Sequence, residues 1–164
     1  MMRILAVLLL LAAGACGFKP SNVIELSSVE TPFRVSAMDP FSGLADNIER
    51  ALSRAGVRIA DAGEPANAIS ITKEIIDRSP LSLDSNAQVT EYTLRYHVVY
   101  SLVDAAGNTL IDNQIVELRR EYSFDVNTSA GSPAEEELLK REMQAEMIRA
   151  ILRRTSIVLQ SQAK

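Results

Sequence analysis

The most regular pattern in the chain is an alternation of apolar and mixed positions over residues 92–103. The apolar positions are Tyr92, Leu94, Tyr96, Val98, Tyr100 and Leu102. Side chains of a strand point alternately to its two faces, so this period of two predicts a strand with one buried face and one mixed face. The Asp104–Asn108 segment contains a Gly and an Asn that tolerate positive φ, which indicates a tight turn. The next strand, over about residues 109–124, should therefore return antiparallel.

Polar residues interrupt the apolar phase of that return strand, which predicts a bulge or a solvent-exposed edge. The interruptions are Asp112, Gln114 and Arg120, set among the in-phase residues Leu110, Val116, Leu118, Tyr122 and Phe124.

Two more strands are predicted before this hairpin. The first lies near Phe33–Val35, just after Pro32. The second contains Ile69, Ile71 and Ile75 with polar residues between them. Because proline donates no backbone hydrogen bond, Pro80 should bend or end this second strand.

Helical spacing of apolar residues predicts one helix before the second strand and one after the last strand. Ser42 can cap the first helix and Gly56 can end it, with an apolar stripe of Leu44, Ile48, Ala51, Leu52 and Ala55. The second helix spans residue 134 to about residue 160, with an apolar face of Leu139, Met143, Met147, Ala150 and Ile151, widened by Ile148 and Leu152.

The order strand, helix, three strands, helix predicts an α+β fold. The four strands should form one mostly antiparallel sheet, and both helices should pack on one face of it, because each helix has a single apolar stripe to cover. A chain of 164 residues normally forms one domain. We expect that domain to span residues 32–160 and the last residues, 161–164, to fray.

The amino terminus has the features of a bacterial lipoprotein signal. Ile4–Ala13 is an apolar run too short for a transmembrane helix and suited to a signal peptide. The small residues 13–15 and the following Cys16 resemble a lipobox, although an ordinary secretory signal is the alternative. We expect residues 1–15 to be removed, Cys16 to carry the lipid and residues 16–31 to form a tether. Gly17 stands where an Asp would resemble an inner-membrane retention signal, which favours the outer membrane.

The composition of the chain limits which ligands and reactions are plausible. The single Cys excludes an internal disulfide, and with a single His it leaves only carboxylates for a metal site, so we expect neither a metal nor another cofactor. His97 has no recognisable nucleophile partner, and the chain has no glycine-rich phosphate loop, so we expect no enzyme activity and no catalytic residue. A formal net charge of −4 argues against nucleic acid as a ligand.

Two sets of residues are candidates for contacts. The mixed face of the central strand carries Thr93, Arg95, His97 and Val99, a combination that suits a protein partner, with a merely solvated sheet face as the alternative. Arg95, Arg119 and Arg120 could meet anionic phosphate groups of a lipid or of a partner, or could simply be solvated.

Short segments in the same order along the mature chain resemble the LptE family of lipopolysaccharide-assembly lipoproteins. They are Cys16-Gly17-Phe18, Asp39-Pro40-Phe41, Glu91-Tyr92-x-Leu94, Asp104–Asn108, Arg119-Arg120-x-Tyr122-Ser123-Phe124, Lys140-Arg141-Glu142-Met143 and Ile151-Leu152-Arg153-Arg154.

The resemblance implies a non-enzymatic outer-membrane lipoprotein on the periplasmic side, held by an N-terminal palmitate-bearing lipid anchor. It would plug the LptD β-barrel, assist its assembly and take part in lipopolysaccharide transport to the outer leaflet. Relatives carry basic loop residues for lipopolysaccharide contact, whereas residues 84–88 and 126–134 here contain none. The alternative hypothesis is a stand-alone periplasmic lipid-binding lipoprotein of a transport system.

Overall fold

A computed structural model describes residue 26, residues 29–124 and residues 132–162. Their elements follow the order strand, helix, three strands, helix. They are β1 (Phe33–Ala37), α2 (Gly43–Arg54), β2 (Asn67–Leu83), β3 (Val89–Val103), β4 (Thr109–Ser123) and α3 (Ser132–Gln162).

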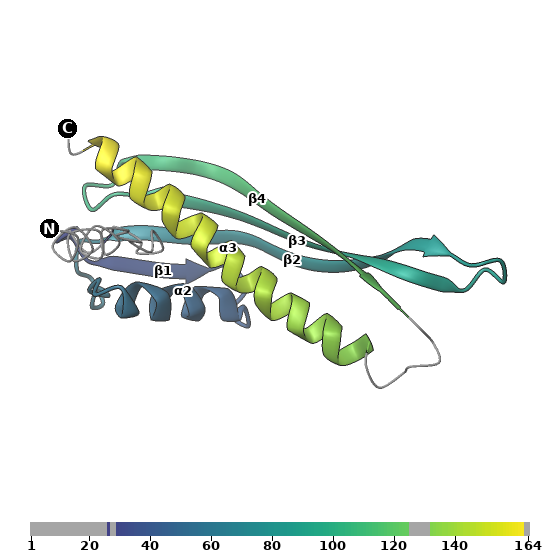
Figure 1. The fold of residues 1–164 in the computed structure, drawn as a ribbon. Helices are drawn as coiled ribbons and strands as arrows, with labels where there is room; N and C mark the ends of the chain where they lie inside the picture. The colour runs from purple at the N-terminus through teal and green to yellow at the C-terminus, as the bar shows by residue number, and fades with distance from the viewer. Residues whose placement is uncertain (1–25, 27–28, 125–131, 163–164) are drawn as a thin grey trace, which may run out of the picture.

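The strands form one sheet in the order β1-β2-β3-β4. β1 is parallel to β2, and the two remaining pairs are antiparallel. Both helices lie on the same face of this sheet, and the distal part of the β2–β3 hairpin extends beyond them (Figure 1). The predicted α+β fold with a mostly antiparallel four-stranded sheet and two helices on one face is therefore confirmed.

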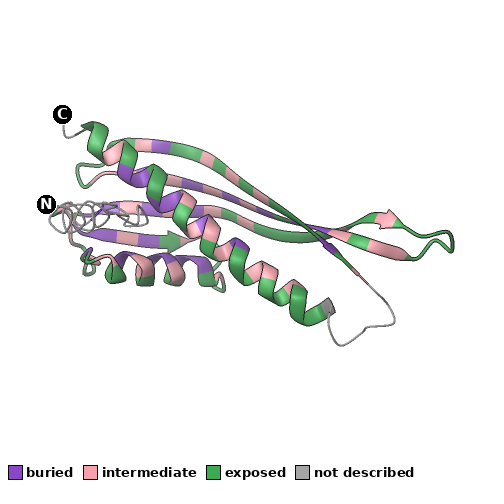
Figure 2. Cartoon of the chain, viewed as in Figure 1, coloured by how far each residue is buried: buried purple, intermediate pink, exposed green. Residues whose placement is uncertain are grey.

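The core is the layer between the sheet and the two helices. The even-numbered residues of β3 from Leu94 to Leu102 are all buried there, as the alternation predicted. α2 contributes Leu44, Ile48 and Leu52, and α3 contributes Met143, Met147, Ile151 and Leu152, all in one continuous cluster. Burial is concentrated where the helices face the sheet (Figure 2). A single core thus joins elements from both ends of the domain.

Local signals in the sequence set the ends of α2. The Ser42 hydroxyl accepts a hydrogen bond of 3.2 Å from the Leu44 N–H, which satisfies one of the free donors of the first turn. After the helix, Gly56 adopts a φ of +80°, a conformation that side chains with a Cβ disfavour. The predicted cap and stop of this helix are confirmed.

Pro80 does not end the second strand, since β2 continues to Leu83, but the pairing with β3 shifts register directly after Pro80. The carbonyl of Ile71 faces the side of β1, where it accepts a hydrogen bond from Met38. A register shift between Ile71 and Lys73 inserts one residue into β2. The backbone of Pro80 therefore points to the same side of the strand as the backbone of Ile71. This side of β2 has no partner strand beyond the end of β1, so the lack of an N–H at Pro80 removes no hydrogen bond between strands.

The return strand contains the predicted bulge. Its register shifts between Tyr100 and Leu102, and Asn113 takes a positive φ of 43°. The inserted residue changes the phase of the strand, so Ile111 is buried in place of the expected Leu110, which is only half-buried.

Among the described segments, no helix has the length and apolar character needed to cross a membrane.

We predict that Leu94→Ala destabilises the domain by about 2–5 kcal/mol, because it opens a cavity in the centre of the core. Leu94 is fully buried, whereas Leu138 on α3 is 48% exposed. The matched control Leu138→Ala should change the free energy of unfolding by about 0.5 kcal/mol or less. Urea unfolding followed by circular dichroism measures both, and equal effects would contradict this account of the core.

Candidate functional surface

The face of the sheet opposite the helices has no element of the described chain packed on it. Its residues come from three strands in register, and we call this set the open face. It consists of Lys73, Ile75 and Asp77 from β2, Thr93, Arg95, His97 and Val99 from β3, and Ile115, Glu117, Arg119 and Glu121 from β4.

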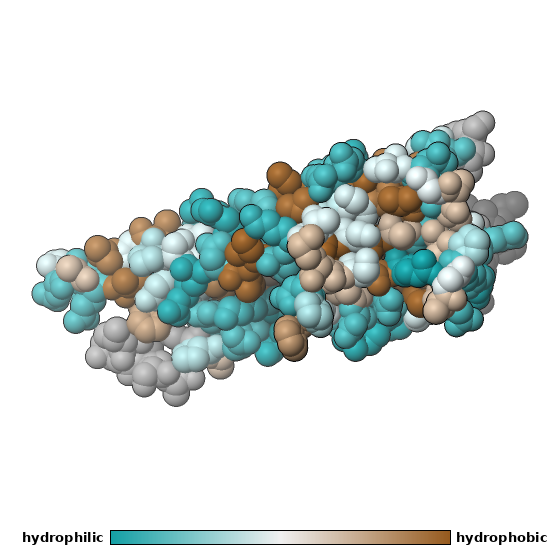
Figure 3. Space-filling model, turned by 180° about the vertical axis from the view of Figure 1, so that it is seen from behind, coloured by the Kyte–Doolittle hydropathy of each residue, from teal (hydrophilic) through white to brown (hydrophobic). Residues whose placement is uncertain are grey.

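The apolar residues of the open face gather toward one of its ends. Val99 lies between Lys73 and Ile115 in the register, and the next row places His97 beside Ile75. Ile75 and Ile115 are 41% and 56% exposed, so these side chains meet solvent rather than the core. Viewed from behind, hydrophobic and hydrophilic residues are interspersed along the molecule (Figure 3). This mixture is typical of surfaces that contact another protein.

The charges on the open face form loose, balanced pairs. Glu117 lies 3.9 Å from Arg95 and 3.5 Å from Nδ1 of His97, and Arg119 lies 3.0 Å from Glu121. The arginine and glutamate side chains are about half exposed, so each arginine–glutamate pair contributes only about 0–1 kcal/mol to stability. Such pairs can exchange partners at little cost when another surface approaches.

The structure separates the residues that the sequence analysis grouped. Arg95 and Arg119 are cross-strand neighbours on the open face. Arg120 lies on the opposite, helix-covered side, where it forms an ion pair with Glu146 of α3, because adjacent residues of a strand point to opposite faces. Thr93 belongs to the open face by register but is only 3% exposed, so little of it meets solvent. Cys16 lies outside the described residues.

A polar cluster that was not predicted from the sequence joins α3 to the hairpin. Glu136 accepts hydrogen bonds of 2.9 Å from Arg78 and 2.6 Å from the Tyr122 hydroxyl, and it lies 2.8 Å from Lys140. Burial alone would raise the pKa of Glu136, but hydrogen bonds from Lys140, Tyr122 and Arg78 outweigh it and lower the pKa to about 2. The cluster fixes the first turns of α3 against β2 and β4.

Aromatic side chains extend this cluster along the hairpin. The guanidinium of Arg78 lies 4.4 Å from the ring centre of Tyr92, within the range of a cation–π contact. Tyr92 also stacks on Tyr122 and meets the edge of Phe124. The residues that β2 and β4 contribute are far apart in sequence from Glu136, so no local spacing signals their meeting with it.

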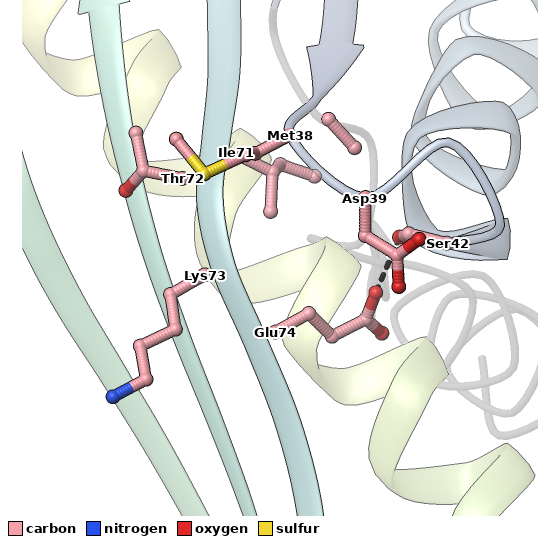
Figure 4. Close-up of a pocket in the computed structure, with 8 residues that line it drawn as sticks. Met38, Asp39, Ser42, Ile71, Thr72, Lys73 and Glu74 are labelled. Carbon is pink, nitrogen blue, oxygen red and sulfur yellow. Dashed lines mark hydrogen bonds between the residues drawn. The ribbon is translucent and has the colours of Figure 1, made fainter.

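A groove of about 340 Å³ lies where β1 ends beside β2. Figure 4 shows Ser42 and Glu74 meeting across it through a hydrogen bond in which the Ser42 hydroxyl donates. The other Glu74 oxygen accepts a 2.5 Å hydrogen bond from the Tyr96 hydroxyl. Burial and then this hydrogen bond raise the pKa of Tyr96 well above its ordinary range, so Tyr96 remains a donor. Within the described residues, no group of three His, Cys, Asp or Glu side chains could hold a metal.

The same class of domain is found in solved bacterial lipoproteins. The chain is similar to a rare lipoprotein B from Shewanella oneidensis, at 26% identity and a TM-score of 0.62, over 80% of this chain and 93% of that one. It is also similar to an uncharacterized lipoprotein B from Nitrosomonas europaea, at 28% identity and a TM-score of 0.69, over 80% and 86%. A minor lipoprotein from Acinetobacter baumannii shares the fold at 21% identity and a TM-score of 0.64, over 79% and 92%.

The sequence identifies the family. Residues 31–155 match the sequence model of LptE, described as lipopolysaccharide-assembly, so the chain belongs to the LptE family and the predicted membership is confirmed. Its members are lipoproteins of outer-membrane biogenesis, typically with a signal peptide and a palmitate, and they assemble lipopolysaccharide rather than act as enzymes. In general they partner with LptD and lipopolysaccharide. No curated protein matches the chain significantly in sequence.

We predict that Glu136→Gln lowers the free energy of unfolding at pH 7 by about 1–3 kcal/mol, the scale of hydrogen bonds to charged groups. The pKa of Glu136 lies below its ordinary value of 4.5 in the folded chain, so its contribution is complete above about pH 5. The contribution is lost as the pH falls from 4.5 toward 2. The stability difference between the wild type and the variant should therefore shrink over this window, and a constant difference would refute the assignment.

Proposed function

We propose that this chain is a non-enzymatic outer-membrane lipoprotein that plugs an LptD-type β-barrel, assists its assembly and takes part in lipopolysaccharide transport to the outer leaflet. The observation that carries this proposal is the match to the LptE family over residues 31–155, which covers most of the described domain. A role in lipopolysaccharide assembly follows from the family itself, and the barrel contact is the proposed part.

The position of the helices on one face of the sheet supports the proposal of a protein partner on the other face. The helices cover one face of the sheet, so the other face is available to a second protein. On that face Ile75, Val99 and Ile115 lie in adjacent rows, flanked by weakly paired charges. A small apolar area bordered by polar residues is the usual composition of a protein–protein contact. We assign the barrel contact to the open face, with Arg95, His97 and Val99 at its centre and Thr93 beneath it.

Arg95 and Arg119 are the proposed contacts for phosphate groups of lipopolysaccharide. They are neighbours across two strands, and their present partners are half-exposed glutamates that a phosphate could displace. Arg120 could join them only if its ion pair with Glu146 opened and its side chain left the helix side.

The proposed anchor places this domain at the membrane. Residues 1–15 would be removed, Cys16 would carry the acyl chains, and residues 16–31 would connect them to the domain that begins just before β1. Several acyl chains hold a protein stably, since each buried CH2 contributes about 0.8 kcal/mol. The anchored domain would therefore enter its barrel from the periplasmic side.

The proposal predicts that the tagged, full-length chain retains an LptD-type barrel on purification from membranes. Ile115→Asp should reduce the retained barrel about tenfold, because it buries an unpaired charge in the contact. Ile157→Asp is the matched control, since Ile157 is also 56% exposed but lies on α3, and it should leave retention unchanged. A wild-type chain that never retains such a barrel would defeat the proposal, and uptake of a lipid by the isolated domain would then favour the stand-alone alternative.

Removal of the anchor should separate membrane attachment from folding. We predict that Cys16→Ser moves most of the chain from the membrane fraction to the soluble periplasmic fraction, because its local concentration at the membrane falls. Its thermal unfolding midpoint should match that of the wild-type domain. Fractionation and circular dichroism measure the two effects, and loss of folding in the variant would contradict the proposed role of Cys16.

A further inference from the structure

The edge of β2 beyond the end of β1 is unpaired. β1 has five residues and β2 has seventeen, and their pairing ends at Ala37 and Ile71. One further hydrogen bond, from the Met38 N–H to the Ile71 carbonyl, closes this pairing. β2 then continues with β3 on one side and no strand of the described chain on the other. We call this side of β2, from Glu74 to Arg78, the outer edge.

The phase of the strand shows which backbone groups face the outer edge. The Ile71 carbonyl faces the side of β1. Because Thr72 is an inserted residue, the backbone groups of Glu74, Ile76 and Arg78 point to this same side of β2. Among the described residues, no hydrogen bond outside the β2–β3 ladder occupies the backbone groups of these three residues. Unpaired N–H and C=O groups in a row are a template for another strand.

Two of the three charged side chains of the outer edge are turned away from its free backbone, and the third, Asp77, lies on the open face. Glu74 is turned toward the helices, where it binds Ser42 and Tyr96. Arg78 is turned to the same side and binds Glu136 while covering Tyr92. The exposed side chains that remain include Ile75 and Ile76, each 41% exposed and on opposite faces of the strand. The edge therefore offers apolar surface on both sides of its free backbone.

Two grooves follow one another along the outer edge. The 340 Å³ groove, lined by Met38, Thr72 and Lys73 among others, ends at Glu74. A groove of about 240 Å³ begins at Glu74 and lies between Ile76 and α3. Arg141 is one of the α3 residues that line it. α3 continues past the end of β1 alongside β2 (Figure 1). A strand placed in line with β1 would thus have β2 at its side and α3 above one face.

The opposite edge of the sheet is less suited to pairing. β4 carries a bulge at Asn113 and a run of charged residues, Arg119, Arg120 and Glu121. Bulges and charges are the usual means by which proteins keep an edge from pairing. At the outer edge of β2, the corresponding obstacle is Pro80, which lies beyond Arg78 and limits the free stretch to about the length of β1.

We propose that an extended segment of a protein partner pairs with the outer edge and continues the line of β1 as an added strand. The alternating backbone donors and acceptors select a polypeptide strand over a lipid, because only a strand matches them in spacing. Its side chains toward the helices would include an apolar residue beside Ile76 and an acidic residue that meets Arg141, which has no ion pair with a described residue. This inference goes beyond the open-face contact and does not depend on the identity of the barrel.

Photocrosslinking in cells tests the pairing on the full, lipidated chain. A photoreactive phenylalanine analogue is placed separately at the exposed positions Ile75, Ile76 and Asp77, with Ile157 on α3 as the control position. The three edge positions should crosslink to one segment of one protein, and the mapped sites should advance by about one residue for each step along β2. Adducts with lipid, with a second copy of this chain, or at scattered sites would overturn the proposal, as would no adduct at all.

A backbone variant tests the hydrogen bonding. Ile76→Pro removes an outward N–H and no bond to β3, so it should reduce the adduct from a probe at Asp77 about tenfold, whereas Ile76→Val should not. Unchanged adduct formation in a folded Ile76→Pro chain would contradict the inference. If that variant fails to fold, the register of the three crosslinks still decides the question. If the chain retains no barrel but the crosslinks keep their register, only the proposed function fails. If the chain retains the barrel but the crosslinks show no register, only this inference fails.

Discussion

Burial of the even-numbered face of β3 beneath α2 and α3 is the interaction on which the rest of the domain depends. Leu94, Tyr96, Val98, Tyr100 and Leu102 occupy the middle of the single core, and each neighbouring element contributes its apolar stripe to them. Since side chains alternate along a strand, this burial fixes which residues of β3 face the other way. The open face is thus a direct consequence of the core.

The same constraint explains why the polar features lie where they do. On the helix side, Arg120 pairs with Glu146 and Arg78 pairs with Glu136, and both pairs hold α3 to the sheet. Arg95 and Arg119 lie on the side without helices. Side chains that stabilise the fold and side chains that remain available to a partner are therefore separated by the sheet itself. The proposed barrel contacts on Arg95, His97 and Val99 all fall in the second group.

The sequence predicted most of the fold because its signals are local. The alternation in β3, the Ser42 cap, the Gly56 stop and the turn at 104–108 each depend on nearby residues, and the structure confirms them. The path of β2 through Pro80 could not be predicted, because it depends on how far β1 extends along its neighbour. The Glu136 cluster brings together residues of β2, β4 and α3, and no spacing in the chain signals such a meeting.

The central claim is that the open face, rather than the helix-covered side, meets the barrel. Cysteine accessibility tests it directly, with Ile115→Cys as the reporter and Ile157→Cys as the reference in otherwise native chains. A water-soluble maleimide should label both positions in the isolated domain, but only position 157 in the purified complex with the barrel. Equal labelling of position 115 in the isolated domain and in the complex would contradict it.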